Sequence, residues 1–477
     1  MYYFRLIAFV VCSSYAQGAD LRVASAFSSH MVVQEGEPIP IWGWAAADED
    51  VRVRWDDGDV LTTRAVGGEW MVELPARTCG EDAFSAHTIQ IESGSEALEI
   101  EDVLVGEVWL ASGQSNMEWP LVMSNAFEAT QALAPILGLR VFTAARISAP
   151  ERMDNVEGSW KTFTAENCGS FSAVGTYFGL ELLRALNKPI GVLHTSWGGS
   201  RIEAWMSPER LMEHAEGRSQ LQLDPATFPP NHKPSFLSNG MIAPFEGLPL
   251  AGCIWYQGES NAEDPSAYGR LFPAMIQDWR ARFGQLALPF YFVQLANFTP
   301  QAGSDWPGLR EAQRKTVELV PNTGMAVIFD VGDEHDIHPR NKKTVGSRLA
   351  RLALSQTYGH DLMGAAPFPV AAAILPEGVC SIQFEEVRSD LLPVNALLEL
   401  GGFELAGDDG IFVAASAAVS GNTVLVTWTQ ASVPSQVRYC WMDDPAGVNR
   451  LQVEGLPVSP FHLQITGLPA EGPVDPK

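Results

Sequence analysis

Between residues 103 and 359, short apolar runs alternate with longer segments of helical periodicity, and this alternation is the feature that most limits the fold. Strands are expected at 103–111, 190–196, 251–256, 290–295 and 325–330, and helices at 174–187, 267–283, 309–320 and 342–358. A chain that repeats strand and helix in this way builds a parallel sheet with helices on both sides. Reactive groups in such folds gather at the carboxyl ends of the strands.

The segments on either side of this region have a different pattern. Residues 20–100 contain short alternating runs such as 51–55 and 87–91, and β-rich runs such as 423–428 return after about residue 368. Short strands separated by glycine and acidic turns are typical of antiparallel β domains, most often sandwiches. A chain of 477 residues also exceeds what one core usually supports. We therefore expect a sandwich-like N-terminal domain at 19–101, an α/β domain at 102–360 and a C-terminal β-rich region at 361–477.

The first 18 residues have the composition of a cleavable secretory signal. Arg5 is followed by a short apolar run, and the small residues Ala16 and Gly18 precede the expected cleavage site. The run is too short to cross a bilayer, and no later segment reaches the roughly 20 apolar residues of a membrane helix. We expect a secreted or periplasmic protein without a membrane span.

Charge and cysteine usage exclude several classes of partner. The 57 acidic residues outnumber the 31 Lys and Arg residues, so the net charge of −26 argues against a nucleic-acid partner. Five cysteines follow the signal: Cys79, Cys168, Cys253, Cys380 and Cys440. They form no CxxC pair and have no histidines at zinc spacing, so neither a metal site nor a cofactor is expected. An oxidising compartment would allow one or two disulfides. The oligomeric state stays open.

Polar, glycine-bearing turns follow four of the expected strands. Their sequences are GQSN at 113–116, TSWGGSR at 195–201, QGESN at 257–261 and DVGDEHDIHP at 330–339. Together they supply hydroxyls, glycine amides, side-chain amides and carboxylates beside histidines. Acyl transfer needs this set: a nucleophile, a base, a carboxylate that orients the base, and N–H donors for the oxyanion.

Each role in acyl transfer has a candidate residue. Ser115 would attack the carbonyl carbon, His338 would take its proton, and Asp336 could orient the imidazole because it lies two residues earlier in an extended segment. The oxyanion donors would be the Ser115 amide, Gly199 and Gln257. Chemistry alone leaves other choices open. Ser196, Ser200 and Ser260 are alternative nucleophiles, His335 is an alternative base, and the glycine pair at 198–199 also fits a tight turn.

At these turns the chain resembles the sialate O-acetylesterase family, a branch of the SGNH hydrolases. The matching stretches include GEVWLASGQSNMEWPL, HTSWGGSRIEAW, AGCIWYQGESNA and TGMAVIFDVGDEHDIHPRNKKTVGSRLA, and they occur in family order. The resemblance implies a three-layer α/β/α, flavodoxin-like catalytic domain between the β-rich regions. It also implies metal-independent removal of O-acetyl groups from sugars, with Ser115 as nucleophile and His338 as base.

The third catalytic member is less well defined. Many SGNH enzymes carry the acid three residues before the histidine, and that place is His335 in this chain. Asp336, Asp333 and Asp330 therefore all remain candidates. Position 117 is methionine, so the turn is not the G-x-S-x-G elbow of α/β-hydrolases.

The expected substrate is an O-acetylated sugar, with acetylated sialic acid as the first choice. Acetylated xylan or another neutral polysaccharide is the second, and a carbohydrate-binding protein without activity is the third. An acidic protein would repel the sialic acid carboxylate unless an arginine held it. Arg201 is the candidate for that contact, although it could instead pair with Glu203. Glu259 and Asn261 are further candidates for substrate binding.

Overall fold

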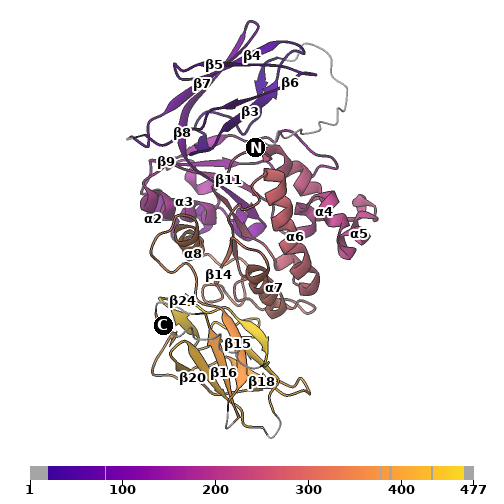
Figure 1. Ribbon diagram of the computed structural model, residues 1–477, viewed down its shortest axis with the longest axis vertical. Helices are drawn as coiled ribbons and strands as arrows, with labels where there is room; N and C mark the ends of the chain where they lie inside the picture. Colours follow the sequence, from indigo (N-terminus) through magenta and orange to yellow (C-terminus); the bar gives the residue numbers. More distant parts are fainter. Residues whose placement is uncertain (1–19, 81, 376–377, 386–388, 431–432, 467–477) are drawn as a thin grey trace, which may run out of the picture.

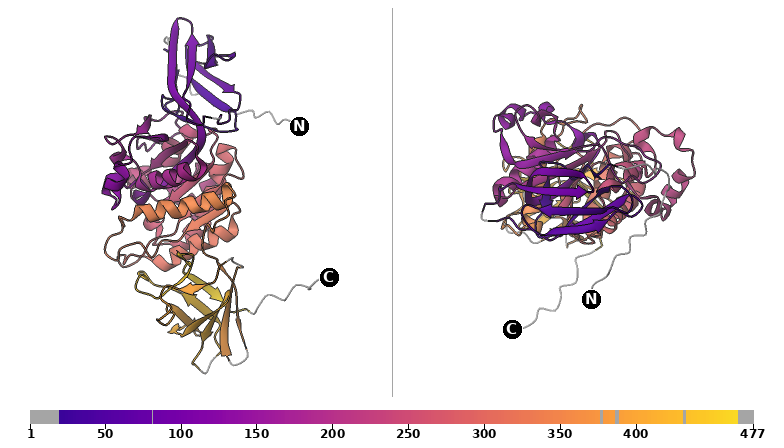
Figure 2. Two further views of the ribbon diagram at one scale, coloured as in Figure 1. Left: turned by 90° about the vertical axis from the view of Figure 1, so that its left-hand side faces the viewer. Right: turned by 90° about the horizontal axis from the view of Figure 1, so that it is seen from above.

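The computed structural model describes residues 20–80, 82–375, 378–385, 389–430 and 433–466. The signal expected at 1–18 lies outside these ranges. Three parts are stacked along the long axis of the molecule: the N-terminal strands, a central α/β region and the C-terminal strands (Figures 1 and 2). The fold is mixed α/β, with one large mixed sheet and additional antiparallel sheets. No helix in the described ranges has the length and apolar character needed to cross a membrane.

The central sheet contains a strand at or beside each of the five predicted positions, but the last one, expected at 325–330, lies at Thr323–Ala326. Its order is β10-β9-β11-β8-β12-β13-β14. The bounds are β8 (Glu96–Gly113), β9 (Ile136–Thr143), β10 (Trp160–Phe163), β11 (Ile190–Ser196), β12 (Gly252–Tyr256), β13 (Phe290–Val293) and β14 (Thr323–Ala326). All pairings except that of β10 with β9 are parallel. If the five predicted strands are numbered 1 to 5 in chain order (β8, β11, β12, β13 and β14), their order across the sheet is 2-1-3-4-5.

Two strands of the sheet, β9 and β10, were not predicted. The signal of β9 is interrupted by Arg140, a cation in the middle of an apolar run. This side chain is buried, and its guanidinium binds both carboxylate oxygens of Asp102 at 2.6 and 3.0 Å. A buried charge of this kind is stable only when it is paired, and the partner cannot be seen from the local pattern.

Helices cover both faces of the sheet. The longer ones are α3 (Ala173–Leu186), α6 (Pro265–Phe283), α7 (Trp306–Leu319) and α8 (Lys342–Leu352), and the shorter ones are α1 (Ser115–Glu118), α2 (Phe127–Gln131), α4 (Pro208–Met212) and α5 (Ala215–Leu221). Successive strand residues point to opposite faces. Trp109 joins the apolar cluster of α3 and α8, whereas Leu110 joins that of α6 and α7. The helix expected to reach residue 358 ends at Leu352 and continues as a π-helical turn over Ala353–Thr357.

The N-terminal strands are joined to the central sheet by a single long strand. They are β1 (Arg22–Val23), β2 (Val32–Gln34), β3 (Ile39–Trp44), β4 (Asp50–Trp55), β5 (Val60–Arg64), β6 (Glu69–Leu74) and β7 (His87–Ser93). The first part of β8 pairs antiparallel with β7, and its last seven residues pair parallel with β11. The boundary expected at 101/102 therefore lies inside one continuous strand.

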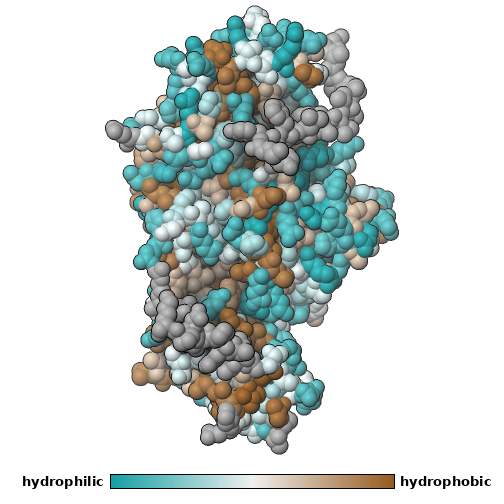
Figure 3. Space-filling model, viewed as in Figure 1, coloured by the Kyte–Doolittle hydropathy of each residue, from teal (hydrophilic) through white to brown (hydrophobic). Residues whose placement is uncertain are grey.

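The C-terminal strands form three small antiparallel sheets around one apolar cluster. They are β15 (Pro369–Ile374), β16 (Val379–Phe384), β17 (Leu392–Pro393), β18 (Phe403–Ala406), β19 (Val413–Ala414), β20 (Ala417–Ser420), β21 (Thr423–Thr427), β22 (Gln436–Tyr439), β23 (Leu451–Val453), β24 (Leu456–Pro457) and β25 (Phe461–Gln464). Exposed apolar side chains such as Leu397 and Leu398 occur in this part, where the surface shows apolar patches (Figure 3). The five described cysteines are free thiols, so the possible disulfides are not formed.

Candidate active site

Three of the polar turns emerge side by side because their strands are neighbours in register. Gly113, at the end of β8, pairs with Ser196 on β11 and with Tyr256 on β12. The φ angle of Gly113 is +139°, and a Cβ atom there would lie 2.2 Å from the Tyr256 carbonyl oxygen. Only glycine fits this close approach of two backbones. The turn that carries Ser115 is thereby fixed at the carboxyl edge of the sheet.

Ser115 and His338 lie at hydrogen-bond distance. Ser115 begins α1, His338 lies in the loop between β14 and α8, and the Ser115 Oγ to His338 Nε2 distance is 2.9 Å. The imidazole stacks on the Trp119 indole, with ring centroids 4.9 Å apart and planes inclined by 16°. Burial and the Lys342 charge lower the pKa of His338, while Asp336 raises it. The imidazole is therefore neutral near pH 7 and able to accept the serine proton.

Two of the alternative serines are engaged in other hydrogen bonds, and the alternative histidine is exposed. Ser196 is buried, with its Oγ 2.6 Å from Nε2 of His194, and Ser200 is buried and accepts a hydrogen bond from Trp205. The side chain of His335 is 85% exposed and lies near Glu334. These positions favour Ser115 over Ser196 and Ser200, and His338 over His335.

The three candidate acids have different surroundings. Both oxygens of Asp330 bind the Arg348 guanidinium, and one also accepts from Arg450 at 3.3 Å. Asp333 accepts the backbone N–H of His335 at 2.8 Å. Asp336 lies beside the candidate base, with Oδ1 3.9 Å from Nδ1 of His338. Asp336 is thus favoured, although this distance is too long for a hydrogen bond.

Of the three predicted oxyanion donors, two have free N–H groups among the described residues, and the third is already hydrogen-bonded to other residues. Within the described chain, the backbone N–H groups of Ser115 and Gly199 donate no hydrogen bond and are available. Gly198 packs against Ser115, where an added Cβ would lie 3.3 Å from the serine Cβ. The buried Gln257 amide donates instead to the Ser200 carbonyl at 3.1 Å and to Asn261 Oδ1 at 2.7 Å. Both of its N–H groups are therefore engaged in holding the turns together.

Of the predicted substrate-binding residues, two are hydrogen-bonded to neighbouring turns and one is partly exposed. Asn261 accepts from Ile202 N–H at 2.9 Å and donates to Glu203 at 3.0 Å, and Glu259 accepts from Asn116 at 2.6 Å. These side chains are engaged in holding neighbouring turns. Arg201 is 27% exposed, lies 3.8 Å from Glu203 and 3.7 Å from Glu263, and its Nε has no hydrogen-bond partner among the described residues. Substrate contact by these three residues stays a prediction.

Three residues at the site were not predicted: Asn116, Trp119 and Lys342. Lys342 is fully buried and donates to the side-chain oxygen of Asn116. A signal for it exists in the sequence, because Lys342 stands three and seven residues before Val345 and Leu349 and so falls on the apolar face of the predicted helix. A lysine on such a face has to find a polar partner.

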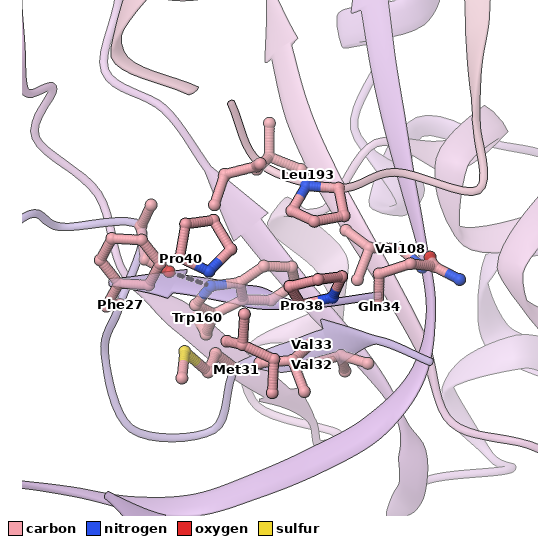
Figure 4. Close-up of a pocket in the computed structure, with 14 residues that line it drawn as sticks. Phe27, Met31, Val32, Val33, Gln34, Pro38, Pro40, Val108, Trp160 and Leu193 are labelled. Carbon is pink, nitrogen blue, oxygen red and sulfur yellow. Dashed lines mark hydrogen bonds between the residues drawn. The ribbon is translucent and has the colours of Figure 1, made fainter. Parts of the chain in front are cut away.

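The site is distinct from an apolar cavity between the N-terminal strands and the central sheet (Figure 4). That cavity is lined by side chains such as Phe27, Trp160 and Leu193, and it reaches Val108 in the part of β8 that pairs with β11. The Gln34 amide, its polar lining group, is bound to Glu107 and to the Val108 N–H. Among the described residues, no cluster of three or more His, Cys, Asp and Glu side chains could hold a metal ion.

Comparison with known proteins shows the family to which the chain belongs. A family model described as "Carbohydrate esterase, sialic acid-specific acetylesterase" matches residues 105–355, a range that includes all four turns. The chain belongs to this acetylesterase family. Human sialate O-acetylesterase is 34% identical over 411 residues, covering 78% of this chain and 77% of the human protein. The rat sialate O-acetylesterase is 33% identical over 435 residues, covering 78% and 80% of the two chains.

A solved structure extends the similarity beyond the central region. The crystal structure of a carbohydrate acetylesterase from Xanthomonas citri has a TM-score of 0.84 and 37% sequence identity, covering 93% of this chain and 99% of that one. The similarity to this member of the acetylesterases thus includes the flanking strands. As a member of the family, this protein is a carbohydrate esterase that removes O-acetyl groups.

Proposed function

We propose that the esterase works through a serine nucleophile, with Ser115 activated by His338. The single observation that carries this proposal is the 2.9 Å contact between the Ser115 hydroxyl and His338 Nε2. His338 takes the hydroxyl proton as Ser115 Oγ bonds to the acetyl carbon. The oxyanion receives hydrogen bonds from the Ser115 and Gly199 N–H groups.

The second half of the reaction regenerates the serine. As the bond between the acetyl carbon and the sugar oxygen breaks, His338 returns its proton to that oxygen and the sugar leaves. Water then attacks the acetyl-enzyme, His338 takes the proton of the water, and Ser115 Oγ regains a proton when acetate departs. Asp336 supports the positive imidazolium that forms twice in this cycle.

The central region is, on this proposal, a three-layer, flavodoxin-like SGNH hydrolase domain. The strand order 2-1-3-4-5 of the five predicted strands is that of flavodoxin-like folds. Helices on both faces and the nucleophile at the carboxyl edge are consistent with it. The expected signal at 1–18 is the basis for proposing a secreted or periplasmic enzyme.

We propose O-acetylated sialic acids as the substrate. The relatives carry sialate O-acetylesterase as their name, and Arg201 beside the Gly199 turn offers a guanidinium for a sugar carboxylate. A neutral, xylan-like polysaccharide is the second candidate. Its support is that Glu203 and Glu263 both lie within 4 Å of Arg201 and can neutralise that cation without a substrate carboxylate.

Replacement of Ser115 tests the proposed chemistry. Ser115→Ala should lower kcat on a small chromogenic acetate by roughly 10⁴-fold or more while the protein stays folded, because the covalent route is lost. Ser260→Ala, which removes the competing hydroxyl of the neighbouring turn, is the matched control and should keep kcat within about twofold of wild type. Substantial activity in Ser115→Ala would show that the nucleophile is another residue, and so would an inactive Ser260→Ala. An inactive but folded Ser115→Ala also separates the esterase from a binding protein.

A further inference from the structure

Lys342 occupies a position that is unfavourable for a cation in two respects. Its side chain is fully buried, and burial lowers its pKa to about 7. It is also the first residue of α8, where the helix dipole places partial positive charge. A lysine that is both buried and at a helix amino terminus lowers stability unless its contacts compensate. Those contacts lead to the reacting groups.

The Lys342 ammonium is joined to three segments of the site through one amide. Its Nζ donates to Asn116 Oδ1, and Asn116 follows the nucleophile directly. The Asn116 Nδ2 donates to Glu259 Oε1 at 2.6 Å and to the backbone carbonyl of Ile337 at 2.9 Å. Ile337 precedes the catalytic histidine. All hydrogen-bonding groups of the Asn116 side chain are thereby used, and the amide fixes the Ser115 turn against the His338 loop.

The same ammonium lies close to the ring on which the catalytic imidazole stacks. Lys342 Nζ is 5.6 Å from the centroid of Trp119 and 5.4 Å from that of Tyr256. Two charged groups act on His338: Lys342 from α8 lowers its pKa, and Asp336 from its own loop raises it. On the other side of the Asn116 amide, Glu259 balances the charge of Lys342. The cation therefore disfavours a second positive charge on His338.

We propose that Lys342 is a positioning residue of the acetyl transfer, which holds the His338 loop to the Ser115 turn through Asn116 and places a positive charge beside the ring on which the imidazole stacks. The inference rests on the proposed Ser115 and His338 chemistry and deepens it. A lysine that served stability alone would affect folding but not the pH at which the catalytic base titrates.

The test is the pH dependence of Lys342→Met, a substitution of similar length without charge. The kcat on a small chromogenic acetate should fall by about tenfold or more, because the loop loses its anchor, while KM changes little. With the cation gone, the imidazolium is less disfavoured and the pKa of His338 rises. The acid limb of kcat/KM should therefore move to higher pH, by about one unit.

Lys343→Met is the matched control because Lys343 is the exposed neighbour on the same helix. It removes the same net charge and should leave both kcat and the acid limb unchanged. If Lys342→Met does not fold, the double variant Lys342→Met with Glu259→Gln removes both members of the charge pair, and its acid limb should move in the same direction. Folding is checked by thermal melting.

An unmoved acid limb in a folded Lys342 variant would overturn the proposal, whether or not kcat falls, and an equal shift in Lys343→Met would do the same. Failure of this inference is distinguishable from failure of the proposed chemistry. Activity that survives Ser115→Ala would refute the nucleophile. If Ser115→Ala is inactive and Lys342→Met has an unchanged pH profile, only the proposed role of Lys342 is refuted.

Discussion

The Asp336 carboxylate binds the backbone of His338 and not its ring. Oδ1 accepts the His338 N–H at 2.9 Å, whereas the distance from Oδ1 to the imidazole Nδ1 is 3.9 Å. The aspartate therefore closes a tight turn ahead of His338, the proposed base, and acts on its ring through its charge. This differs from a serine protease, where the acid is hydrogen-bonded to Nδ1.

Asp336→Asn should consequently be milder than the loss of a hydrogen-bonded triad acid. The asparagine side-chain oxygen can still accept the turn hydrogen bond, and we expect kcat to fall by about 10-fold to 100-fold, compared with ~10⁴ in a serine protease. The carboxylate raises the pKa of His338. Its removal should lower that pKa and move the acid limb of kcat/KM to lower pH, opposite to the direction expected for Lys342→Met.

Asp333→Asn serves as the control for this measurement. Asp333 closes a similar turn three residues earlier by accepting the His335 N–H, so the substitution removes the same charge from the same loop. Its pH profile should match that of wild type. A loss near ~10⁴ in Asp336→Asn would instead mean that the carboxylate reaches Nδ1 during the reaction.

The second prediction concerns Gly113, the glycine before the turn that carries Ser115. Gly113→Ala would place a Cβ 2.2 Å from the Tyr256 carbonyl oxygen in a backbone conformation that side chains rarely adopt. We expect a loss of more than about 3 kcal/mol in the free energy of unfolding, since two neighbouring strands would have to separate. Esterase activity should fall with it, as Ser115 moves with the turn. Chemical denaturation and the chromogenic assay measure the two effects.

Gly36→Ala separates conformational strain from the clash. Gly36 also has positive φ, at +78°, but an added Cβ there would meet no atom within 4 Å. This variant should lose only about 1 kcal/mol and keep full activity. Equal destabilisation by the two substitutions would contradict the close-packing explanation of Gly113.

The parts of the fold that the sequence predicts are those encoded by local pattern. The five strands and four helices around the site have apolar periodicity over enough residues to be recognised, and the turn residues Gly113 and Gly199 lie at strand ends as expected. Strand β9 was missed because Arg140 interrupts its pattern, and its partner Asp102 lies 38 positions away in the sequence. Pairings of this kind are tertiary and leave no local trace.

The candidate site likewise combines residues that local sequence pattern indicates with contacts that only the tertiary fold creates. Ser115 and His338 could be predicted because their turns match the motifs of the family that the chain resembles, but 223 positions separate them and only the fold brings them together. Gln257 has the right chemistry for an oxyanion donor, yet its hydrogen bonds to Ser200 and Asn261 depend on the relative placement of two turns. Which donors stay free is a property of the assembled sheet edge, and the residue types alone could not predict it.

The last prediction separates sialic acid from a neutral sugar. If the Arg201 guanidinium holds the substrate carboxylate, Arg201→Ala should raise KM for acetylated sialic acid by about 10-fold to 100-fold, the equivalent of one charge-assisted hydrogen-bonded contact. KM for a neutral chromogenic acetate should stay within twofold, because that substrate has no carboxylate. Arg184→Ala removes one positive charge from an exposed position on α3. It therefore controls for the effect of making the net charge of −26 more negative. Equal changes in KM for both substrates would mean that Arg201 only holds its turn through Glu203 and Glu263, and the neutral polysaccharide would become the favoured substrate.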